Sequence, residues 1–385
     1  MKPTIGRICL LALGPALGLG IARFAYGLLL PAMKSDLGWS YSQAGWINTV
    51  NAIGYIAGAS SAAAAARRLG AARTYGLGAL VTIVSLFALG LTDNFVTLSL
   101  FRFLSGISGA WIFVTGGAMT ISLAAGQPRD RSIAIGIFYA GAGFGLSATG
   151  LLVPGWLEMF GQQSWRSIWL LLAAMGAVFA LAGYYSARTA APTHASSNGT
   201  RSGYSSFDHK WVLLGYAAFG AGSTGYMTFM VAYLKSSGQP AWHLSAFWTA
   251  IGLAAMAAPW IWSRLLSTAQ NAVAFSTLVG MNTFGAALAL AFPSFSGSIS
   301  SAVVFGSTFF AVVAATSEYV RCNVNPTQKT DAIGAFTLAF GLGQTLGPFA
   351  IGLITDTTGS LVQGLLTGIL VAAAGAVLSL MQRPS

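Results

Sequence analysis

The sequence predicts an all-α membrane protein with twelve transmembrane helices in two halves of six. Only 7% of its 385 residues are charged and 55% are hydrophobic, whereas about 25% of a soluble domain is charged. The mean hydropathy of +0.70 is typical of a chain that lies mostly in lipid. Twelve apolar stretches are long enough to cross a hydrocarbon core, and one polar segment separates the sixth from the seventh. This composition excludes both a soluble fold and a disordered chain.

Each apolar stretch is expected to form one helix. Lys2 and Arg7 precede the first stretch as in a signal peptide, but the apolar run continues past Arg23 to Pro31. A signal peptide has an apolar region of only about 7 to 15 residues, so we expect a membrane helix. Runs such as 170–181 lack the alternation of barrel strands. The twelve stretches are 8–33, 43–66, 74–91, 95–124, 132–153, 167–187, 211–234, 244–263, 272–292, 298–320, 332–355 and 361–381.

A polar segment at 188–210 is the predicted linker between the two halves. It is rich in Ser, Thr, Gly and Ala, and such a composition behaves as a flexible coil. We therefore expect an N-terminal bundle at 1–187, a mobile cytoplasmic linker without an active site, and a C-terminal bundle at 211–385.

Basic residues predict the orientation in the membrane. The net charge is +11, but Lys and Arg lie between the apolar stretches and form no single face, so topology explains them better than nucleic-acid binding. With the N-terminus inside, fourteen Lys and Arg residues fall on the cytoplasmic side. Three fall on the opposite side, namely Lys34, Arg166 and Lys235. Both termini are therefore expected in the cytoplasm. Cys9 and Cys322 are read as free thiols that form no metal cluster.

The two halves contain a repeat. The segment 134–138, AIGIF, with Gly143 and Gly145, recurs as AIGAF at 332–336 with Gly341 and Gly343, a constant shift of 198 residues. A shift of six helices keeps the orientation in the membrane, so the halves are expected to be parallel repeats related by an axis along the membrane normal. Chance similarity between two glycine-rich helices is the alternative.

Three local patterns then give a resemblance to a known family. The chain has Arg102-x-x-x-Gly106 in the fourth stretch and Arg67-Arg68-Leu-Gly70-Ala-Ala-Arg73 between the second and third. Its first stretch reads GLGIARFAY at 18–26, followed by Pro31. These patterns resemble the major facilitator superfamily, and the last one its YbfB/YjiJ-like branch of bacterial transporters. The resemblance implies two six-helix bundles with pseudo-two-fold symmetry and alternating access, but no substrate. Arg67 replaces the loop motif's Asp, which weakens the expected charge lock at the inner gate.

Arg23 is the leading candidate for binding substrate. It lies about 22 Å into the first helix at 1.5 Å per residue, and an arginine at that depth is tolerated when it faces a wet cavity or a partner. Tyr26 should lie one turn further on the same face. A guanidinium with a phenol beside it suits a carboxylate. The alternative is a structural arginine that is bonded to carbonyl groups or reaches the outer surface from the outer half of the membrane.

Other polar side chains within the stretches could complete a pocket. In lipid, such residues, for example Asn48, Asn51 and Tyr55 at helical spacing, should face protein or water, although each alone is better explained by a hydrogen bond between helices. The expected substrate-binding set besides Arg23 and Tyr26 is Asn48, Asn51, Trp111, Thr115, Tyr226, Tyr233 and Gln344.

Acidic residues are scarce in the apolar stretches. Glu318 is the one acid expected to enter the bilayer, so it is a candidate for carrying a coupling proton, with an ion pair to Arg321 as the alternative. Arg102 is the second candidate, since the family resemblance suggests a packing, gating or proton-relay role. An interior that holds more positive than negative charge attracts anions.

Small residues predict where helices approach and pivot. The expected gating set combines the loop motif, the glycine of the Arg-x-x-x-Gly pattern, four glycines of the repeat and a proline: Arg67, Arg68, Gly70, Arg73, Gly106, Gly143, Gly145, Gly341, Gly343 and Pro348.

The sequence therefore predicts a monomeric secondary transporter of the bacterial inner membrane, which moves a small organic anion with a proton and needs no cofactor or metal. The alternative is a proton-driven exporter of amphipathic compounds. An intramembrane enzyme would need clustered acid–base or metal-binding residues such as H-E-x-x-H, and an ATP-driven pump a phosphate-binding loop; neither pattern occurs. A channel stays open as an alternative, although the parallel repeat favours rocking bundles.

Overall fold

A computed structural model describes residues 2–124, 128–189, 204–268 and 272–382, and in these residues every regular element is helical. The first predicted helix consists of three pieces, α1 (Lys2–Pro15), the π-helical η1 (Ala16–Phe24) and α2 (Ala25–Leu37). The rest of the N-terminal half comprises α3 (Tyr41–Leu69), α4 (Ala71–Leu89), α5 (Phe95–Leu123), α6 (Pro128–Phe160) and α7 (Trp165–Ala187). The C-terminal half comprises α8 (Lys210–Ser236), α9 (Ala241–Ile261), the short α10 (Ser263–Thr268), α11 (Ala272–Ala291), α12 (Phe295–Asn323), α13 (Lys329–Thr358) and α14 (Leu361–Leu380).

The predicted twelve helical segments and the all-α membrane fold are thus confirmed. In the described residues, ten of the segments are long and apolar enough to cross a membrane. The other two are α3 and α8, whose buried residues include polar side chains such as Asn48, Asn51 and Thr228.

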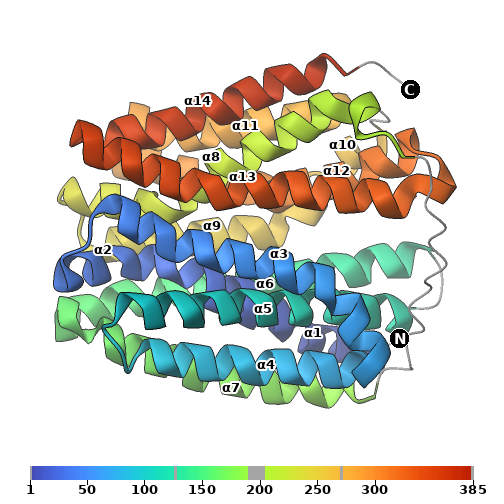
Figure 1. Cartoon of the computed structure of the whole chain (residues 1–385), viewed down its shortest axis with the longest axis horizontal. Coiled ribbons are helices and arrows are strands. Elements are labelled where there is room, and N and C mark those ends of the chain that lie inside the picture. The colour runs from blue at the N-terminus through green and yellow to red at the C-terminus, as the bar shows by residue number, and fades with distance from the viewer. Residues whose placement is uncertain (1, 125–127, 190–203, 269–271, 383–385) are drawn as a thin grey trace.

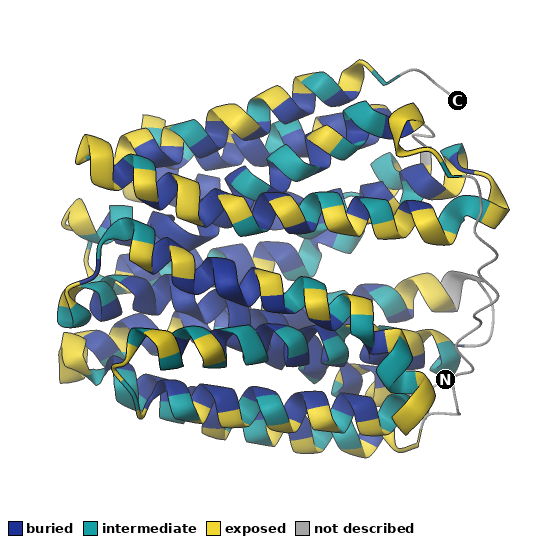
Figure 2. Ribbon diagram, in the orientation of Figure 1, coloured by how far each residue is buried: buried dark blue, intermediate teal, exposed yellow. Residues whose placement is uncertain are grey.

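The two halves lie side by side, with the helices of both running roughly along the same axis (Figure 1). Both chain termini lie at one end of the bundle, here called the terminal end, and the opposite end is called the far end. Buried residues gather toward the middle of the molecule and exposed ones line its outer edges (Figure 2). Many of these exposed residues are large and apolar, such as Val96 and Leu181 at 74% exposure, as expected of surfaces that face lipid.

Glycines let the helices of the two halves approach closely. A Cβ on Gly143 of α6 would lie 2.5 Å from the carbonyl oxygen of Gly252 in α9. Its repeat partner Gly341 of α13 contacts Ile56 of α3. The α6–α9 and α3–α13 contacts therefore join the halves at positions related by the repeat.

The second glycine pair of the repeat packs inside each half. A Cβ on Gly145 would lie 2.4 Å from the carbonyl oxygen of Ala16 in η1, and a Cβ on Gly343 would lie 1.8 Å from that of Ala217 in α8. The two glycines thus hold the same place against the first helix of their own half, which is the pseudo-two-fold relation that the repeat predicts.

The first predicted helix is not a continuous α-helix. Pro15 lacks an N–H donor, and the next nine residues, Ala16–Phe24, adopt the wider π-helical register. The glycines of this segment allow close packing, since a Cβ on Gly20 would lie 2.5 Å from the Cα atom of Gly145. Short π-helical segments often occur at functional sites, and this one carries Arg23.

The predicted linker at 188–210 falls mostly outside the described residues, which exclude 190–203. Within the described part, Ser206–His209 forms the 3-10 helix η3, which leads into α8. His209 Nδ1 lies 2.9 Å from the hydroxyl of Tyr319 in α12, and its ring stacks on Tyr204 at 5.7 Å. Burial lowers the pKa of the His209 imidazole.

Candidate functional site

A cavity of about 480 Å³ lies between the two halves. The N-terminal half contributes residues of η1, α3, α5 and α6 to its wall, and the C-terminal half contributes residues of α8, α12 and α13. The lining residues are Leu19, Arg23, Phe24, Tyr55, Ile56, Ala59, Ser60, Phe113, Val114, Tyr139, Tyr216, Phe309, Phe310, Val313, Ser317, Ile333, Gly334, Thr337, Leu338 and Phe340. Among these described residues, Arg23 carries the one formal charge.

The cavity extends from Arg23 toward the terminal end. Ser60, Ser317 and Ile333 line it near the terminal ends of α3, α12 and α13, and Ile333 is 52% exposed. The structure is therefore one in which the cavity is accessible from the end that holds both termini.

Contacts between the halves close the far end. The carboxylate of Asp356 in α13 accepts hydrogen bonds of 2.8 Å from the backbone N–H groups of Tyr41 and Ser42, at the N-terminus of α3. Closer to the middle, Thr49 donates to the carbonyl oxygen of Thr345 at 2.6 Å, and Asn48 donates to Thr228 at 2.7 Å. Lys235 also donates to Gln162 across the same end.

Arg23 lies at the closed end of the cavity and joins the two halves. Its guanidinium donates a hydrogen bond to Oε1 of Gln344 in α13. The Cζ atom lies 5.0 Å from the ring centre of Tyr55 and 5.4 Å from that of Phe24. Both rings attract the cation, so they hold the guanidinium at the closed end of the cavity.

Arg102 is fully buried and has a different environment. Its guanidinium donates to the carbonyl oxygens of Ala22 and Arg23, the latter at 3.3 Å, and to Oδ1 of Asn48 at 3.2 Å. It also lies 4.9 Å from the ring centre of Tyr26. Arg102 thus binds the backbone of η1 and is absent from the cavity wall.

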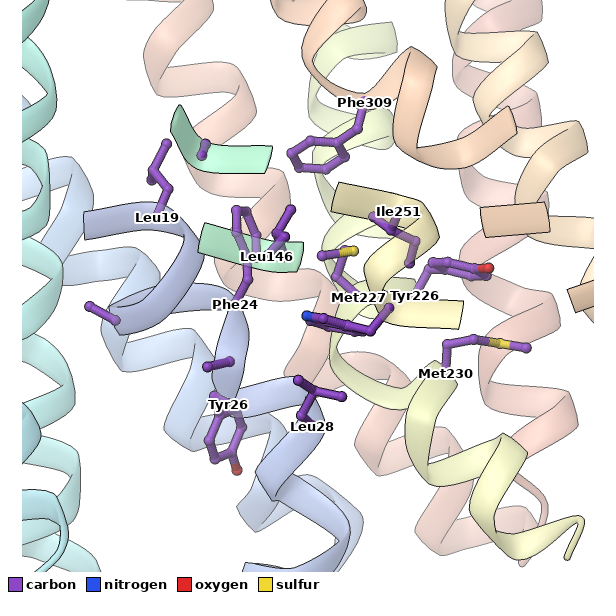
Figure 3. Close-up of a cluster of buried hydrophobic side chains, with 14 of the residues drawn as sticks. Leu19, Phe24, Tyr26, Leu28, Leu146, Tyr226, Met227, Met230, Ile251 and Phe309 are labelled. Atoms are coloured by element: carbon purple, nitrogen blue, oxygen red, sulfur yellow. The ribbon is translucent and has the colours of Figure 1, made fainter. Parts of the chain in front are cut away.

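The expectation that Tyr26 lies beside Arg23 is wrong. The Tyr26 hydroxyl donates to the carbonyl oxygen of Ala44 at 2.8 Å, and its ring contacts Arg102 instead. In Figure 3, Tyr26 and Phe24 point in opposite directions from the same segment, and Phe24 points toward Phe309. The expectation assumed 3.6 residues per turn, whereas the π-helical register of η1 turns the following residues to a different face.

The other predicted substrate-binding residues do not line the cavity. Asn51 bonds to the Arg102 carbonyl oxygen and Ser105, Trp111 to Ser61, and Thr115 to the Trp111 carbonyl oxygen. Tyr226 bonds to Ser301 within the C-terminal half, and Tyr233 packs against its core. Asn48 and Gln344 make the contacts between the halves given above. Most of this set therefore forms hydrogen bonds between or within helices, the alternative that the sequence left open.

Glu318 pairs with Arg321 on the same helix, as the alternative expectation had it. Arg321 donates to both carboxylate oxygens, and the Glu318 side chain is 26% exposed. Its neighbour Ser317 lines the cavity, whereas Glu318 does not.

The predicted gating residues fall into two groups. Arg67, Arg68, Gly70 and Arg73 are exposed around the turn between α3 and α4 at the terminal end, where Gly70 has a φ of +86°. The others lie at close contacts between helices: a Cβ on Gly106 would lie 2.1 Å from the Asn51 carbonyl oxygen, and Pro348 faces Gly45 across the two halves.

Sequence reasoning missed most of the aromatic wall. Tyr139, Tyr216 and Phe309 lie on apolar helices, and a sequence gives no means to tell an aromatic side chain that faces a cavity from one that faces lipid. Tyr55 is the exception, because its helical spacing from Asn48 and Asn51 singles it out as a polar residue that faces protein or water, and it does line the cavity.

Comparison with known proteins decides the family. Residues 15–382 match the family described as uncharacterised MFS-type transporter YbfB, where MFS stands for the major facilitator superfamily. The chain belongs to this family. It is also 26% identical over 355 residues to the uncharacterized MFS-type transporter YceJ of Bacillus subtilis (strain 168), covering 88% of this chain and 87% of that protein. This membership confirms the predicted family and identifies the protein as a multi-pass membrane transporter and not an enzyme.

Solved structures of major facilitators share the fold. A bacterial homologue of the human lysosomal transporter Spinster, in an inward-facing and occupied conformation, superposes with a TM-score of 0.75 at 16% identity, covering 97% of this chain and 96% of that one. The nucleoside transporter NupG superposes with a TM-score of 0.73 at 15% identity, covering 98% of both chains. At these identities the likeness supports the fold alone.

Proposed function

We propose that this major facilitator moves a small organic anion, a carboxylate, across the bacterial inner membrane by alternating access, as a monomer and together with a proton. The observation that carries this proposal is Arg23, the one charged group among the described residues of the cavity wall. A guanidinium can hold a carboxylate by two parallel hydrogen bonds. A cavity with one fixed cation and no described acid favours anions over cations.

The orientation is part of the proposal. The terminal end carries most of the Lys and Arg residues, so the positive-inside rule puts this end and the cavity opening in the cytoplasm. Reporter fusions at the C-terminus test this: green fluorescent protein should fluoresce and alkaline phosphatase should stay inactive. The reverse pattern would mean that the terminal end and the cavity opening face away from the cytoplasm.

Ligand binding tests the anion proposal directly. Ligand that binds the folded state raises its stability by about 2.7 kcal/mol at a hundredfold excess over Kd. We expect a carboxylate from a panel of acetate, succinate, gluconate and benzoate to raise the Tm of the wild type and of Arg131→Gln, an exposed arginine outside the cavity. Arg23→Gln should lose this response. An equal response in Arg23→Gln would refute the role of Arg23.

Proton coupling needs a group that changes its protonation state. Glu318 is the proposed carrier, because it adjoins Ser317 of the cavity wall and would have to leave Arg321 to take a proton. In proteoliposomes, Glu318→Gln should abolish accumulation driven by a pH gradient and leave counterflow exchange intact. Unchanged gradient-driven uptake would remove Glu318 from the mechanism.

A second function, export of amphipathic compounds, is favoured by the aromatic residues of the cavity wall. The same Tm measurement with tetraphenylphosphonium distinguishes the two functions. Stabilisation of the wild type and Arg23→Gln alike by this cation, without any response to carboxylates, would favour the exporter.

A further inference from the structure

We infer that the substrate is an aromatic monocarboxylate, an inference that rests on the proposed transport of carboxylates. Its basis is the combination of one available cation with a wall of aromatic rings from both halves. The rings belong to Phe24, Tyr55, Phe113, Tyr139, Tyr216, Phe309, Phe310 and Phe340.

Among the described residues, the cavity wall offers a counter-ion for one carboxylate. Arg102, the second buried arginine in the described part of the chain, donates instead to the carbonyl oxygens of Ala22 and Arg23 and to Asn48. Arg23 retains donors, because a guanidinium has five N–H groups and the described residues accept one of its hydrogen bonds, through Gln344. A second carboxylate on the same ligand would be buried among rings without a partner, which is costly.

The rings around the cavity leave flat apolar surface for the body of the ligand. On the side of the N-terminal half, the rings of Phe113 and Tyr139 lie 5.4 Å apart. On the side of the C-terminal half, Tyr216 and Phe340 stack at 5.0 Å with an interplanar angle of 27°. A planar ring between these pairs can add offset-stacked or edge-to-face contacts, which an aliphatic ring of equal size makes less well.

The size of the cavity agrees with a single small molecule. Its volume of about 480 Å³ lies in the lower part of the range of about 300 to 1,000 Å³ that is usual for small-molecule sites. A ligand of one or two rings that contacts both halves would fill the space next to Arg23.

Four probes that each contain a single six-membered ring test the inference on the purified full-length protein in lipid nanodiscs, with apparent Kd taken from ligand-dependent Tm. The probes are benzoate, cyclohexanecarboxylate, phthalate and benzamide. We expect benzoate to bind about fivefold to tenfold more tightly than cyclohexanecarboxylate and at least tenfold more tightly than phthalate. Benzamide, which has the ring without the charge, should give no shift.

Tyr139→Leu separates recognition of the ring from folding. This variant should weaken benzoate binding toward that of cyclohexanecarboxylate and leave cyclohexanecarboxylate itself unchanged, which also shows that the variant is folded. Arg131→Gln serves as the control with wild-type affinities.

The outcomes distinguish this inference from the proposed function. If cyclohexanecarboxylate or phthalate binds as tightly as benzoate, or if no probe binds, the aromatic monocarboxylate is wrong. Carboxylate transport as such then stands or falls with the wider panel above. If benzamide binds as tightly as benzoate, or if Arg23→Gln retains benzoate binding, anion recognition by Arg23 fails and the proposed function fails with it.

Discussion

Among the described residues, two arginines are buried, Arg23 and Arg102, and their partners assign them different roles. Arg23 contacts aromatic rings and Gln344 at the cavity wall, while Arg102 binds two backbone carbonyl groups of the π-helical segment and Asn48. Those carbonyl groups belong to Ala22 and to Arg23 itself. Arg102 therefore holds the backbone that presents Arg23, and we regard it as a positioning residue.

Substitution of the two arginines should affect different measurements. Arg102→Gln removes the buried hydrogen bonds that the guanidinium donates to the carbonyl oxygens of Ala22 and Arg23 and to Asn48, each worth about 1.5 to 3 kcal/mol for a charged donor, so it should lower the apparent Tm strongly. Arg23→Gln removes a single described hydrogen bond and should lower the Tm much less while abolishing carboxylate binding. Arg102→Lys, which keeps the charge without the planar fork, should fall between wild type and Arg102→Gln in Tm. An equal loss of Tm in Arg23→Gln and Arg102→Gln would contradict this division of roles.

At the scale of helices, the repeat in the sequence is a reliable guide to contacts. Gly145 and Gly343, which the sequence aligned, each pack on the first helix of their own half, and Gly143 and Gly341 each contact the opposite half. The repeat is recognisable in the sequence because only small residues allow two backbones to approach so closely, so matching positions in the two halves keep them.

Other features of the helices could not be predicted. The π-helical register at Ala16–Phe24 has no counterpart in the hydropathy pattern of the sequence. The prediction from α-helical spacing therefore placed Tyr26 on the same face as Arg23, which is wrong. The position of Arg23 at a cavity followed from the cost of burying its charge, whereas aromatic residues such as Tyr139 carry no comparable cost in lipid. The sequence therefore predicted the charged part of the candidate site and missed its apolar wall.

Gly143 offers a test of the contact between α6 and α9. A Cβ would lie 2.5 Å from the Gly252 carbonyl oxygen, so Gly143→Ala should force the two halves apart and cost about 1 to 3 kcal/mol, as overpacking does. We expect a lower Tm and slower transport. Gly280→Ala on α11 is the matched control, because an added Cβ there meets no atom within 4 Å. Similar losses of Tm and transport rate in both variants would mean that the loss of any helical glycine, and not of this contact, causes the effect.

For the whole molecule, alternating access requires that the far end can open. The contacts that must break there include the carboxylate of Asp356 in the C-terminal half, which accepts two hydrogen bonds from the N-terminus of α3 in the N-terminal half. A negative charge at a helix N-terminus is stabilised by the helix dipole, and hydrogen bonds to an ionised acceptor are about twice as strong as neutral ones. Asp356 thus stabilises the conformation in which the cavity is accessible from the terminal end.

Asp356→Asn should therefore shift the population toward a conformation that is open at the far end. The amide keeps the shape but loses the charge, and a loss of about 1.4 kcal/mol would change the population ratio tenfold. Spin labels at Gln163 and Ser237, exposed residues of opposite halves at the far end, report the opening as a longer distance in pulsed electron paramagnetic resonance, with Cys9 and Cys322 replaced by Ser. Asp93→Asn is the matched control, because Asp93 pairs at 2.7 Å with Arg166 of its own half. We expect the longer distance in Asp356→Asn alone; a wild-type distribution there, or the same shift in Asp93→Asn, would show that the Asp356 carboxylate does not hold the far end closed.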